Sequence, residues 1–425
     1  MTNTLVGEIR DLIAAEHGIV LAYATVAIEL DRKRKKLLVS LEFLQGGSMS
    51  SYVVWANKGG IGKSTLSFQL ACAAAHENPQ KTVYVIDLSP QCDVSRMLLG
   101  GGHNGGEESI LSLMAGSPRK TVQSYLSDCL NSVPSGHGWP DINDYIVKPN
   151  DHRASTAEDL PDNLRLLTGD FDLERTITLI EQLPQPPRRA GRAPTGPEFS
   201  QYILIRSFIK YGVDQLESSN DSIVIIDTDP YFNVITTHMG LLAADNWVTA
   251  YSPNSQASQF AVMRSLEFMF EPASGLKRFV EDEQARYPSP WFDYRGNPMT
   301  VPSLEIAKPF LLIANMVNPY RLSGGQSYTD PQRLHRQTIT SITERVEAEA
   351  DLYAVDRFPH HEHLWDMRRL GLICDYNGVE LQSLALGSNY PEPGSNKRYH
   401  LNRTGGTPTQ LDGYQRRLRQ VSQLL

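Results

Sequence analysis

The residues with the clearest potential for chemistry form the run Lys58–Thr65, which reads KGGIGKST. This run lies between an apolar stretch, residues 52–56, that predicts a short buried strand and an Ala- and Leu-rich stretch, residues 66–75, that predicts a helix. Strand, glycine-rich turn and helix in this order make a phosphate-binding loop, because the glycines let backbone N–H groups surround an anion and the helix N-terminus adds its positive dipole end. In such a loop Lys63 reaches the β- and γ-phosphates and the Ser64 hydroxyl binds Mg²⁺. The run therefore predicts a nucleotide site.

Two carboxylates follow predicted buried strands and are placed to complete this site. Asp87 ends the apolar run 82–86, and Asp227 ends the β-branched run 223–226. The carboxyl ends of parallel strands lie at the crevice where open α/β sheets bind ligands. Asp227 is therefore expected to hold Mg²⁺, directly or through water, so that the predicted metal ligands are Ser64 and Asp227.

The same stretches resemble a known family. Lys58–Thr65 matches K-G-G-x-G-K-[ST]-T, the deviant Walker A motif of the ParA/MinD family of dimeric ATPases. Asp87–Gln91 resembles the family's switch I segment and Asp227–Pro230 its switch II, and the likeness covers about residues 50–375. The resemblance implies an α/β fold of three layers, built on a doubly wound, mostly parallel sheet of the P-loop NTPase type. It also implies ATP and Mg²⁺ as cofactors.

The resemblance assigns roles to individual residues. In the family's dimers two subunits sandwich the nucleotide, and the first lysine of the loop, here Lys58, reaches the partner's phosphates. Lys58, Lys63 and Asp87 are thus implied as catalytic residues. Beyond the loop, nucleotide contacts are implied for Asn315, which follows a predicted strand, and for Pro359; ordinary turn chemistry is the alternative for Asn315. The nucleotide-binding loop residues are Lys58, Gly59, Gly60, Gly62, Lys63, Ser64 and Thr65.

Ser89 is a departure from the family pattern, because it replaces the second aspartate of switch I. In the family that aspartate positions the attacking water and contacts the magnesium shell. A serine is neutral and is neither an effective base nor a charged magnesium partner. Because phosphoryl transfer depends mainly on positioning and electrostatics, this replacement is expected to slow hydrolysis and to leave binding intact, unless the nearby Asp93 compensates. The sequence therefore predicts nucleotide binding and leaves turnover open.

The pattern of the chain indicates an N-terminal extension, a P-loop domain and a basic tail. The extension carries the cationic run Arg32–Lys36, which is either a DNA-contacting arm or a solvated linker. A third interpretation makes Met49 the natural start of the protein. The expected boundaries are 1–48 for the extension, 49–386 for the domain and 387–425 for the tail, with polar or Pro-rich insertions near 131–160, 184–197 and 272–300.

The tail contains apolar residues at helical spacing with arginines beside them. Packing of this helix on the domain is the default interpretation. A DNA-binding patch is the second, and a membrane-surface helix of the MinD kind is the third, disfavoured by the absence of Phe and Trp from the apolar face. The apolar positions are Leu411, Tyr414, Leu418, Val421 and Leu425.

The segment Ala354–Pro359 resembles the family's last core strand with its nucleotide-side loop. His360, His361 and His363 follow it without the i, i+4 spacing of a helical zinc motif. A polar surface near the nucleotide or the dimer interface is therefore favoured over a metal site.

Composition excludes several protein classes. The formal net charge of −8 argues against a protein that coats nucleic acid by bulk charge, so any DNA contact requires a local basic patch. The 4 cysteines are widely spaced, which fits a reducing cytosol and excludes the common zinc and iron–sulfur spacings. The longest apolar run, residues 18–28, is shorter than the ~20 residues that a membrane span needs. A cytoplasmic location is expected.

The leading functional hypothesis is a ParA-like ATPase of plasmid or chromosome partition, or of cargo positioning. It would dimerise on ATP, bind DNA non-specifically through cations such as Arg368, Arg369 and the tail arginines, and associate with the nucleoid. A protein partner would stimulate its slow hydrolysis. The alternatives are a MinD-like membrane-surface ATPase and a nucleotide-gated interaction protein with little hydrolysis, the latter motivated by Ser89.

Overall fold

A computed structural model describes residues 50–182, 196–217, 221–229, 234–322 and 325–425. These residues belong to one compact unit, Met49–Leu425. The predicted extension 1–48, Met49, the switch II residue Pro230 and most of the predicted insertion at 184–197 lie outside the described residues.

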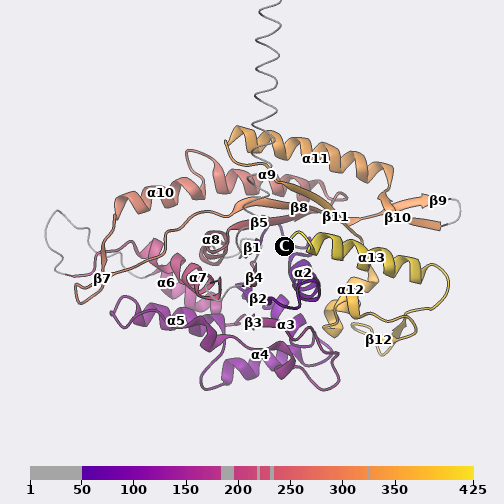
Figure 1. Cartoon of the computed structure of the whole chain (residues 1–425), viewed down its shortest axis with the longest axis horizontal. Coiled ribbons are helices and arrows are strands. Elements are labelled where there is room, and N and C mark those ends of the chain that lie inside the picture. The colour runs from indigo at the N-terminus through magenta and orange to yellow at the C-terminus, as the bar shows by residue number, and fades with distance from the viewer. Residues whose placement is uncertain (1–49, 183–195, 218–220, 230–233, 323–324) are drawn as a thin grey trace, which may run out of the picture. The chain divides into compact units, whose positions relative to one another are not determined.

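A seven-stranded parallel sheet forms the centre of this unit, in the order β11-β8-β5-β1-β4-β2-β3 (Figure 1). Its register sets Val54 of β1 and Asp87 of β2 level with Asp227 of β4. The carboxyl ends of the central strands therefore meet at one edge, and the α/β fold with a parallel sheet is confirmed. The strands are β1 Ser50–Val54, β2 Thr82–Asp87, β3 Leu164–Leu167, β4 Ser222–Asp227, β5 Asn246–Tyr251, β8 Lys308–Val317 and β11 His360–Trp365.

Helices cover both faces of the sheet, because different crossover connections run toward opposite edges of the sheet. The step from β1 to β2 runs toward one edge and the step from β4 to β5 toward the other, so right-handed crossovers place α2 and α8 on opposite faces. Helix α2 packs on β2 and β4, and α7, α8 and α9 pack on the other side (Figure 1). The principal helices are α2 Lys63–Glu77, α7 Gln201–Glu217, α8 Val234–Ala243, α9 Gln256–Phe270, α11 Arg333–Leu352, α12 Arg369–Asn377 and α13 Thr407–Ser422.

Shorter elements connect this framework. The remaining helices are α3 Asp93–Leu98, α4 Gly106–Ala115, α5 Val122–Ser132, α6 Leu173–Glu181 and α10 Leu276–Arg286, with 3₁₀ turns at Ile142–Tyr145, Pro149–His152 and Leu381–Ser383. The remaining strands form three small hairpins: β6 Trp291–Phe292 with β7 Pro298–Met299, β9 Pro319–Leu322 with β10 Gly325–Pro331, and β12 Asn389–Pro391 with β13 Arg398–His400.

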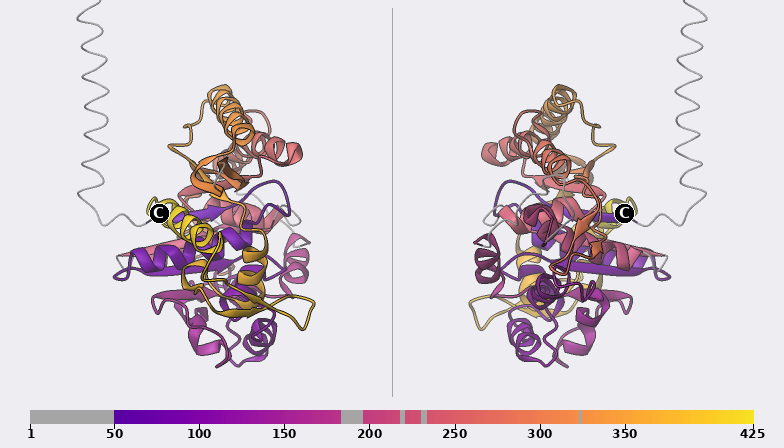
Figure 2. Two further views of the ribbon diagram at one scale, coloured as in Figure 1. Left: turned by 90° about the vertical axis from the view of Figure 1, so that its right-hand side faces the viewer. Right: turned by 90° about the vertical axis from the view of Figure 1, so that its left-hand side faces the viewer.

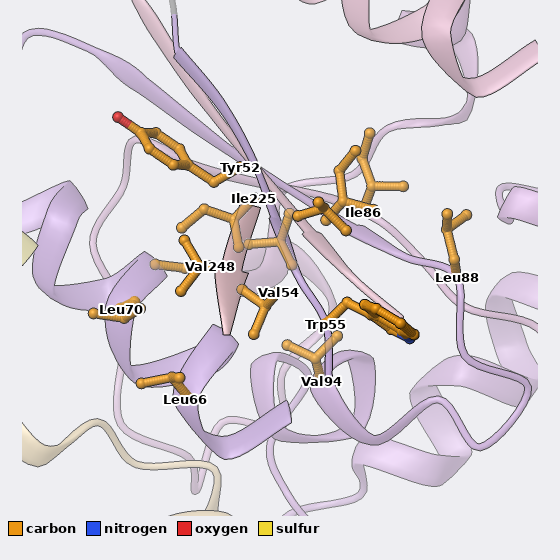
Figure 3. Close-up of a cluster of buried hydrophobic side chains, with 14 of the residues drawn as sticks. Tyr52, Val54, Trp55, Leu66, Leu70, Ile86, Leu88, Val94, Ile225 and Val248 are labelled. Atoms are coloured by element: carbon orange, nitrogen blue, oxygen red, sulfur yellow. The ribbon is translucent and has the colours of Figure 1, made fainter. Parts of the chain in front are cut away.

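The core lies between the sheet and its helices. Strands buried on both faces are made of continuous apolar residues, as in β4, where every position is buried. Val54 and Ile225 lie near Leu66 and Leu70 of α2, and Trp55 lies at the end of β1 (Figure 3). This packing fixes the start of α2 against the carboxyl ends of the strands.

The predicted insertions at 131–160 and 272–300 contain regular structure. Ile142 and Val147 are buried in the first, and Val147 forms an antiparallel bridge with Leu166 of β3. The first segment is thus not a wholly exposed excursion, although its composition is polar. The second contains α10 and the β6–β7 hairpin.

The prediction of the last core strand at Ala354–Pro359 is wrong. The strand is β11, which begins at His360, directly after the predicted segment, and runs parallel to β8. Because β11 is an edge strand, it tolerates polar side chains. Its three histidines and its glutamate interrupt the apolar pattern by which a buried strand is predicted from sequence. Successive side chains of a strand point to opposite faces, and no group of metal-ligating side chains occurs among the described residues.

The C-terminal helix α13 packs on the domain, which confirms the default interpretation of the tail. Leu411, Tyr414, Leu418 and Val421 are buried, and α13, the yellow helix at the C-terminus in Figure 2, packs against α2. The apolar face that a membrane-surface helix would need is therefore covered by protein. Across the described ranges, no helix has both the length and the hydropathy to cross a bilayer.

Candidate nucleotide-binding site

The loop between β1 and α2 has the backbone of a phosphate cradle. Gly60 and Gly62 adopt left-handed conformations, with φ of 72° and 79°, which glycine reaches without strain. A Cβ added at Gly62 would stand 3.1 Å from Asn315 Nδ2 of β8, a tight contact from which the Asn315 side chain would have to shift. Helix α2 begins at Lys63, directly after this turn, and aims its N-terminal N–H groups at the loop.

Lys63 lies inside the loop. Its Nζ donates to the carbonyl oxygen of Lys58 at 3.0 Å, and the residue is buried. Burial lowers the pKa of Lys63, and the nearby carboxylates of Asp227, Asp229 and Asp93 oppose this shift. The ammonium is thus held where an incoming polyphosphate would meet it.

Asp227 is fully buried at the end of β4 and is held by two hydroxyls of α2. Ser64 Oγ donates to its Oδ2 at 2.8 Å and Ser67 Oγ to its Oδ1 at 2.6 Å. Burial raises the pKa of Asp227 to about 6, against the lowering effects of these hydrogen bonds and of Lys63. A buried carboxylate whose charged form is disfavoured is stabilised by a cation, and Mg²⁺ prefers oxygen ligands of this kind. Ser64 and Asp227 therefore fit a magnesium ion.

Asp87 is buried at the end of β2, level with Asp227. Its carboxylate accepts hydrogen bonds from the N–H of Ser89 at 2.9 Å and of Ser95 at 3.1 Å, and from Ser95 Oγ at 2.6 Å. Burial, and secondarily the charge of Asp227, raises the pKa of Asp87 to about 7. Its bonds shape the turn after β2, and the residue does not line the phosphate-side cavity described below.

The predicted switch I segment places a different carboxylate on the site. Ser89 is buried, and its Oγ accepts the N–H of Gln91 at 3.3 Å. Asp93, the first residue of α3, lines the cavity and forms an ion pair with Arg96. Asp93 is thus near enough to matter at this site, but it is already paired.

The described part of the predicted switch II also borders the site. Thr228 Oγ1 donates to the carbonyl oxygen of Val54 at 3.2 Å. Asp229 accepts from Thr236 Oγ1 at 3.2 Å, and both Thr228 and Asp229 line the cavity. The strand end and the start of α8 are therefore connected through Asp229.

These elements enclose a cavity of about 770 Å³, the phosphate-side cavity. Its volume lies in the range of sites for small organic ligands, roughly 300–1,000 Å³. It is lined by the glycine loop, α3, the end of β4 and α12: Gly59, Gly60, Gly62, Lys63, Ser64, Thr65, Ser89, Gln91, Asp93, Arg96, Met97, Gly102, Glu107, Thr228, Asp229, Leu372, Asp375, Tyr376 and Pro393.

Lys58 differs from Lys63. It is half-buried at the start of the loop, and within the described residues its side chain makes no hydrogen bond or ion pair. Its carbonyl oxygen accepts from Lys63, so the backbone of Lys58 belongs to the cradle while its ammonium remains uncommitted.

The two remaining predicted nucleotide contacts lie at opposite ends of the parallel strands. Asn315, near the end of β8, donates from Nδ2 to the carbonyl oxygen of Ile61 at 2.9 Å, so it lies against the loop. Pro359 precedes the first residue of β11 and therefore lies at the amino ends of the parallel strands. The structure does not bring Pro359 to the loop. Asp366–Arg368, which follow β11, lie at the carboxyl ends of the strands instead.

Asp375 of α12 is a site residue that motif reading missed. Thr65 Oγ1 donates to its Oδ2 at 2.8 Å, and Asp375 lines the phosphate-side cavity. Burial raises the pKa of Asp375 to about 6. The contact joins residues 310 apart in the chain, and no motif signals such a pairing.

A second, smaller cavity of about 190 Å³ adjoins the first. We call it the apolar cavity, because most of its wall is apolar. Gly62, Thr65, Leu372 and Asp375 line both cavities. The rest of the wall comes from α2, the ends of β8 and β11, α12 and α13, and consists of Leu66, Gln69, Asn315, Met316, Leu364, Trp365, Asp366, Met367, Arg368, Gly371, Leu381, Tyr414 and Leu418.

Comparison with known proteins gives a family match. The family model described as "CobQ/CobB/MinD/ParA nucleotide binding domain" matches residues 52–370. Comparison with curated proteins gave no match.

Solved structures match the chain at low identity. Apo McdA from Cyanothece is 16% identical, with 88% of this chain and 99% of that chain covered and a TM-score of 0.47. A plasmid partition protein from Borrelia burgdorferi is 16% identical, with 75% and 90% covered and a TM-score of 0.39. Cobyrinic acid a,c-diamide synthase from Mycobacterium smegmatis, with bound ADP and magnesium, is 16% identical, with 71% and 83% covered and a TM-score of 0.39.

Proposed function

Because the chain belongs to the CobQ/CobB/MinD/ParA nucleotide binding domain family, we propose that it is an ATP-dependent dimeric switch of the ParA type. In this proposal ATP binding joins two copies of the chain, the dimer binds DNA without sequence preference, and slow hydrolysis, stimulated by a protein partner, releases it. The observation that carries the proposal is that the Lys58 ammonium has no partner among the described residues, although it stands at the start of an otherwise well-connected phosphate loop.

The loop residues bind the polyphosphate. The N–H groups at the start of α2 and the ammonium of Lys63 meet the phosphate oxygens, and Ser64 and Asp227 hold Mg²⁺. When bound, the ion neutralises part of the charge on the phosphates. Lys63 is buried and Asp227 is tied to Ser64 and Ser67, so these groups are positioned before the ligand arrives.

Lys58 supplies the argument for a dimer. A lysine whose side chain has no partner within the described part of its own subunit, next to a site for an anionic ligand, is available to phosphates bound by a second copy. The family motif places a lysine at this position for that purpose. The role makes nucleotide binding and dimerisation interdependent, which is the property a switch requires.

Hydrolysis is proposed to be slow. Ser89 carries no charge, Asp87 is fully occupied by the turn after β2, and Asp93 is paired with Arg96. No described carboxylate of the switch I segment is therefore both unpaired and on the cavity wall. A partner that separates Asp93 from Arg96 would supply one.

DNA binding is proposed to use cations that lack an acidic partner. Arg368 and Arg369 form ion pairs with Asp366 and Glu392, which reduces their value as phosphate contacts. Four exposed residues of the C-terminal region make no ion pair within the described chain and are better candidates: Lys397, Arg398, Arg403 and Arg419. In this proposal the protein is cytoplasmic and associates with the nucleoid.

Dimerisation and DNA binding are tested on the full chain. Light scattering with Mg²⁺ and either ADP or a non-hydrolysable ATP analogue should show a dimer only with the ATP analogue. Retention on random-sequence duplex DNA should require the same analogue and weaken steeply between ~50 and ~200 mM salt. Lys58→Ala should bind nucleotide and stay monomeric, whereas a monomeric wild type or salt-insensitive DNA binding would refute the corresponding step.

A nucleotide-gated interaction protein with little hydrolysis is the second candidate, favoured by Ser89. Steady-state phosphate release separates the two, measured for wild type and for Ser89→Asp. The ParA-type proposal expects slow release by wild type and a rise on the order of tenfold when the carboxylate is restored. Undetectable release by wild type, with or without DNA, would favour the second candidate.

A further inference from the structure

The boundary between the two cavities is formed by a carboxylate. Asp375 and Thr65 line both the phosphate-side cavity and the apolar cavity, and their side chains are joined by the hydrogen bond from Thr65 Oγ1 to Asp375 Oδ2. A nucleotide whose phosphates occupy the first cavity and whose base occupies the second must place its ribose at this boundary.

The second carboxylate oxygen of Asp375, Oδ1, has no hydrogen-bond partner within the described ranges. Oδ1 is buried and accepts no hydrogen bond from any described residue. A buried polar atom left unpaired costs about 1–3 kcal/mol, and more when it carries charge, so such atoms are rare unless a ligand or water completes them. The acceptor therefore points to a donor that the described part of the protein does not provide.

The chemistry of the two sides matches the parts of a nucleotide. Ribose hydroxyls are hydrogen-bond donors, and a carboxylate is the side chain that accepts from them. The apolar cavity is smaller than the roughly 300–1,000 Å³ of pockets for whole drug-sized ligands, so it suits a single ring system. Trp365, on its wall, has a buried indole N–H without an acceptor among the described residues, and ring nitrogens of a purine are acceptors.

We propose that Asp375 is the residue that reads the ribose of the bound nucleotide, with Oδ1 accepting a hydrogen bond from a ribose hydroxyl while Thr65 holds Oδ2. The base then enters the apolar cavity between the ends of β8 and β11 and α13. This inference rests on the proposed function, because it assumes that the phosphate-side cavity binds a nucleoside triphosphate. It makes α12 part of the specificity machinery.

The test compares nucleotides that differ by one hydroxyl. Isothermal titration of the full chain with unlabelled ATP, 2′-deoxyATP and 3′-deoxyATP, all with Mg²⁺, avoids fluorescent labels that occupy the ribose hydroxyls. A hydrogen bond to a charged group is worth roughly tenfold or more in affinity, so one or both deoxy analogues should bind wild type at least about tenfold more weakly than ATP. The analogue that loses affinity identifies the hydroxyl.

Asp375→Asn is the matched variant, because the amide keeps the size of the side chain and one oxygen for Thr65. It should bind ATP about as weakly as the wild type binds the affected analogue, with the discrimination reduced to near unity. A merely structural Asp375 would weaken all three nucleotides alike. Asp366→Asn is the control, because Asp366 lines the same cavity but its carboxylate already accepts from Arg368 N at 3.1 Å.

The outcomes separate this inference from the function on which it rests. If wild type binds ATP but not more tightly than either deoxy analogue, the ribose assignment is overturned while the nucleotide switch stands, and no variant is needed. Discrimination that survives in Asp375→Asn, or that is lost in Asp366→Asn instead, overturns it as well. If wild type binds no nucleotide, both proposals fail together.

Discussion

The two walls of the nucleotide site are built in different ways. The first wall, formed by the loop before α2 and the end of β4, carries Lys63, Ser64 and Asp227. Ser64 is hydrogen-bonded to Asp227, Lys63 to the carbonyl oxygen of Lys58, and Asp87, behind the wall, to Ser89 and Ser95. The second wall, formed by the end of β11 with α12 and α13, is largely apolar and contributes Asp375, Tyr414 and Leu418. The first wall is thus lined by charged and hydrogen-bonding groups, and the second is lined mainly by apolar side chains.

This difference separates binding energy from selectivity. The groups of the first wall recognise any polyphosphate, because backbone N–H groups, an ammonium and a cation read charge and not the identity of the nucleoside. The second wall meets the ribose and the base in our proposal, so it decides which nucleotide is held. Variants in the two walls should therefore fail in different ways.

Lys63→Ala should produce the largest effect. It removes the buried ammonium that would meet the phosphates in our proposal and leaves Asp227 without its nearby cation. We expect ATP affinity to fall on the order of 100-fold, since charge-assisted bonds are the strongest contacts of the first wall. Titration calorimetry should show the same loss for ATP and for its deoxy analogues.

Lys58→Ala is the matched control for this variant. The carbonyl oxygen of Lys58, which accepts from Lys63, is retained by alanine. Nucleotide affinity should therefore change little in the monomer. An equal loss in both variants would mean that Lys58 serves its own subunit, and would remove the observation on which the dimer proposal depends.

The first wall was predictable from sequence because its geometry is local. Lys58–Thr65 encodes its own turn, and Asp227 is marked by a run of β-branched residues that must end at the ligand edge of a parallel sheet. The parallel sheet followed from the same apolar strands. Asp87 was predicted to be near the site, but its commitment to Ser89 and Ser95 depends on a turn that the pattern does not specify.

The second wall was not predictable in this way. Asp375 reaches Thr65 across 310 residues, and a lone aspartate in a short helix carries no signal of that contact. Pro359 was predicted at the carboxyl ends of the strands, where the ligand binds, because the last strand was expected to end there. The histidine-rich strand begins at His360 instead, so Pro359 lies at the amino ends of the strands. Tertiary packing, not local pattern, brings this wall to the site.

Leu418→Ala should produce the second largest effect, on stability. Leu418 of α13 is 3% exposed and lines the apolar cavity, so truncation of its side chain should lower the free energy of unfolding by about 2–4 kcal/mol. Urea denaturation followed by circular dichroism measures the loss. Leu372→Ala is the control, because Leu372 is 59% exposed on the rim of the same cavity and should change stability by less than about 0.5 kcal/mol.

The same denaturation experiment tests whether the walls fold together. If they form one cooperative unit, unfolding followed by tryptophan fluorescence and by circular dichroism should coincide in both wild type and Leu418→Ala. A separate early transition in the variant would show that α13 is released before the first wall unfolds.

The smallest predicted effect is a pH dependence that magnesium removes. The pKa of Asp87 is raised to about 7 and that of Asp227 to about 6, so the folded chain binds more protons than the unfolded chain, whose aspartates titrate near 3.8. Stability contributed by these groups is therefore present at low pH and lost as pH rises through the window from about 4 to 7. Between pH 5.5 and 7.5 we expect a loss on the order of 2 kcal/mol in the absence of divalent cations.

Magnesium distinguishes the walls in this experiment. An ion held by Ser64 and Asp227 stabilises the ionised carboxylates, so millimolar Mg²⁺ should raise the denaturation midpoint at pH 7.5 and have little effect at pH 5.5. Ser64→Ala should abolish this response. Asp375→Asn should reduce the pH dependence, because burial also raises the pKa of Asp375 to about 6, but it should leave the magnesium response intact. A magnesium response that disappears in Asp375→Asn would place the cation at the second wall. It would contradict the assignment of magnesium binding to the first wall.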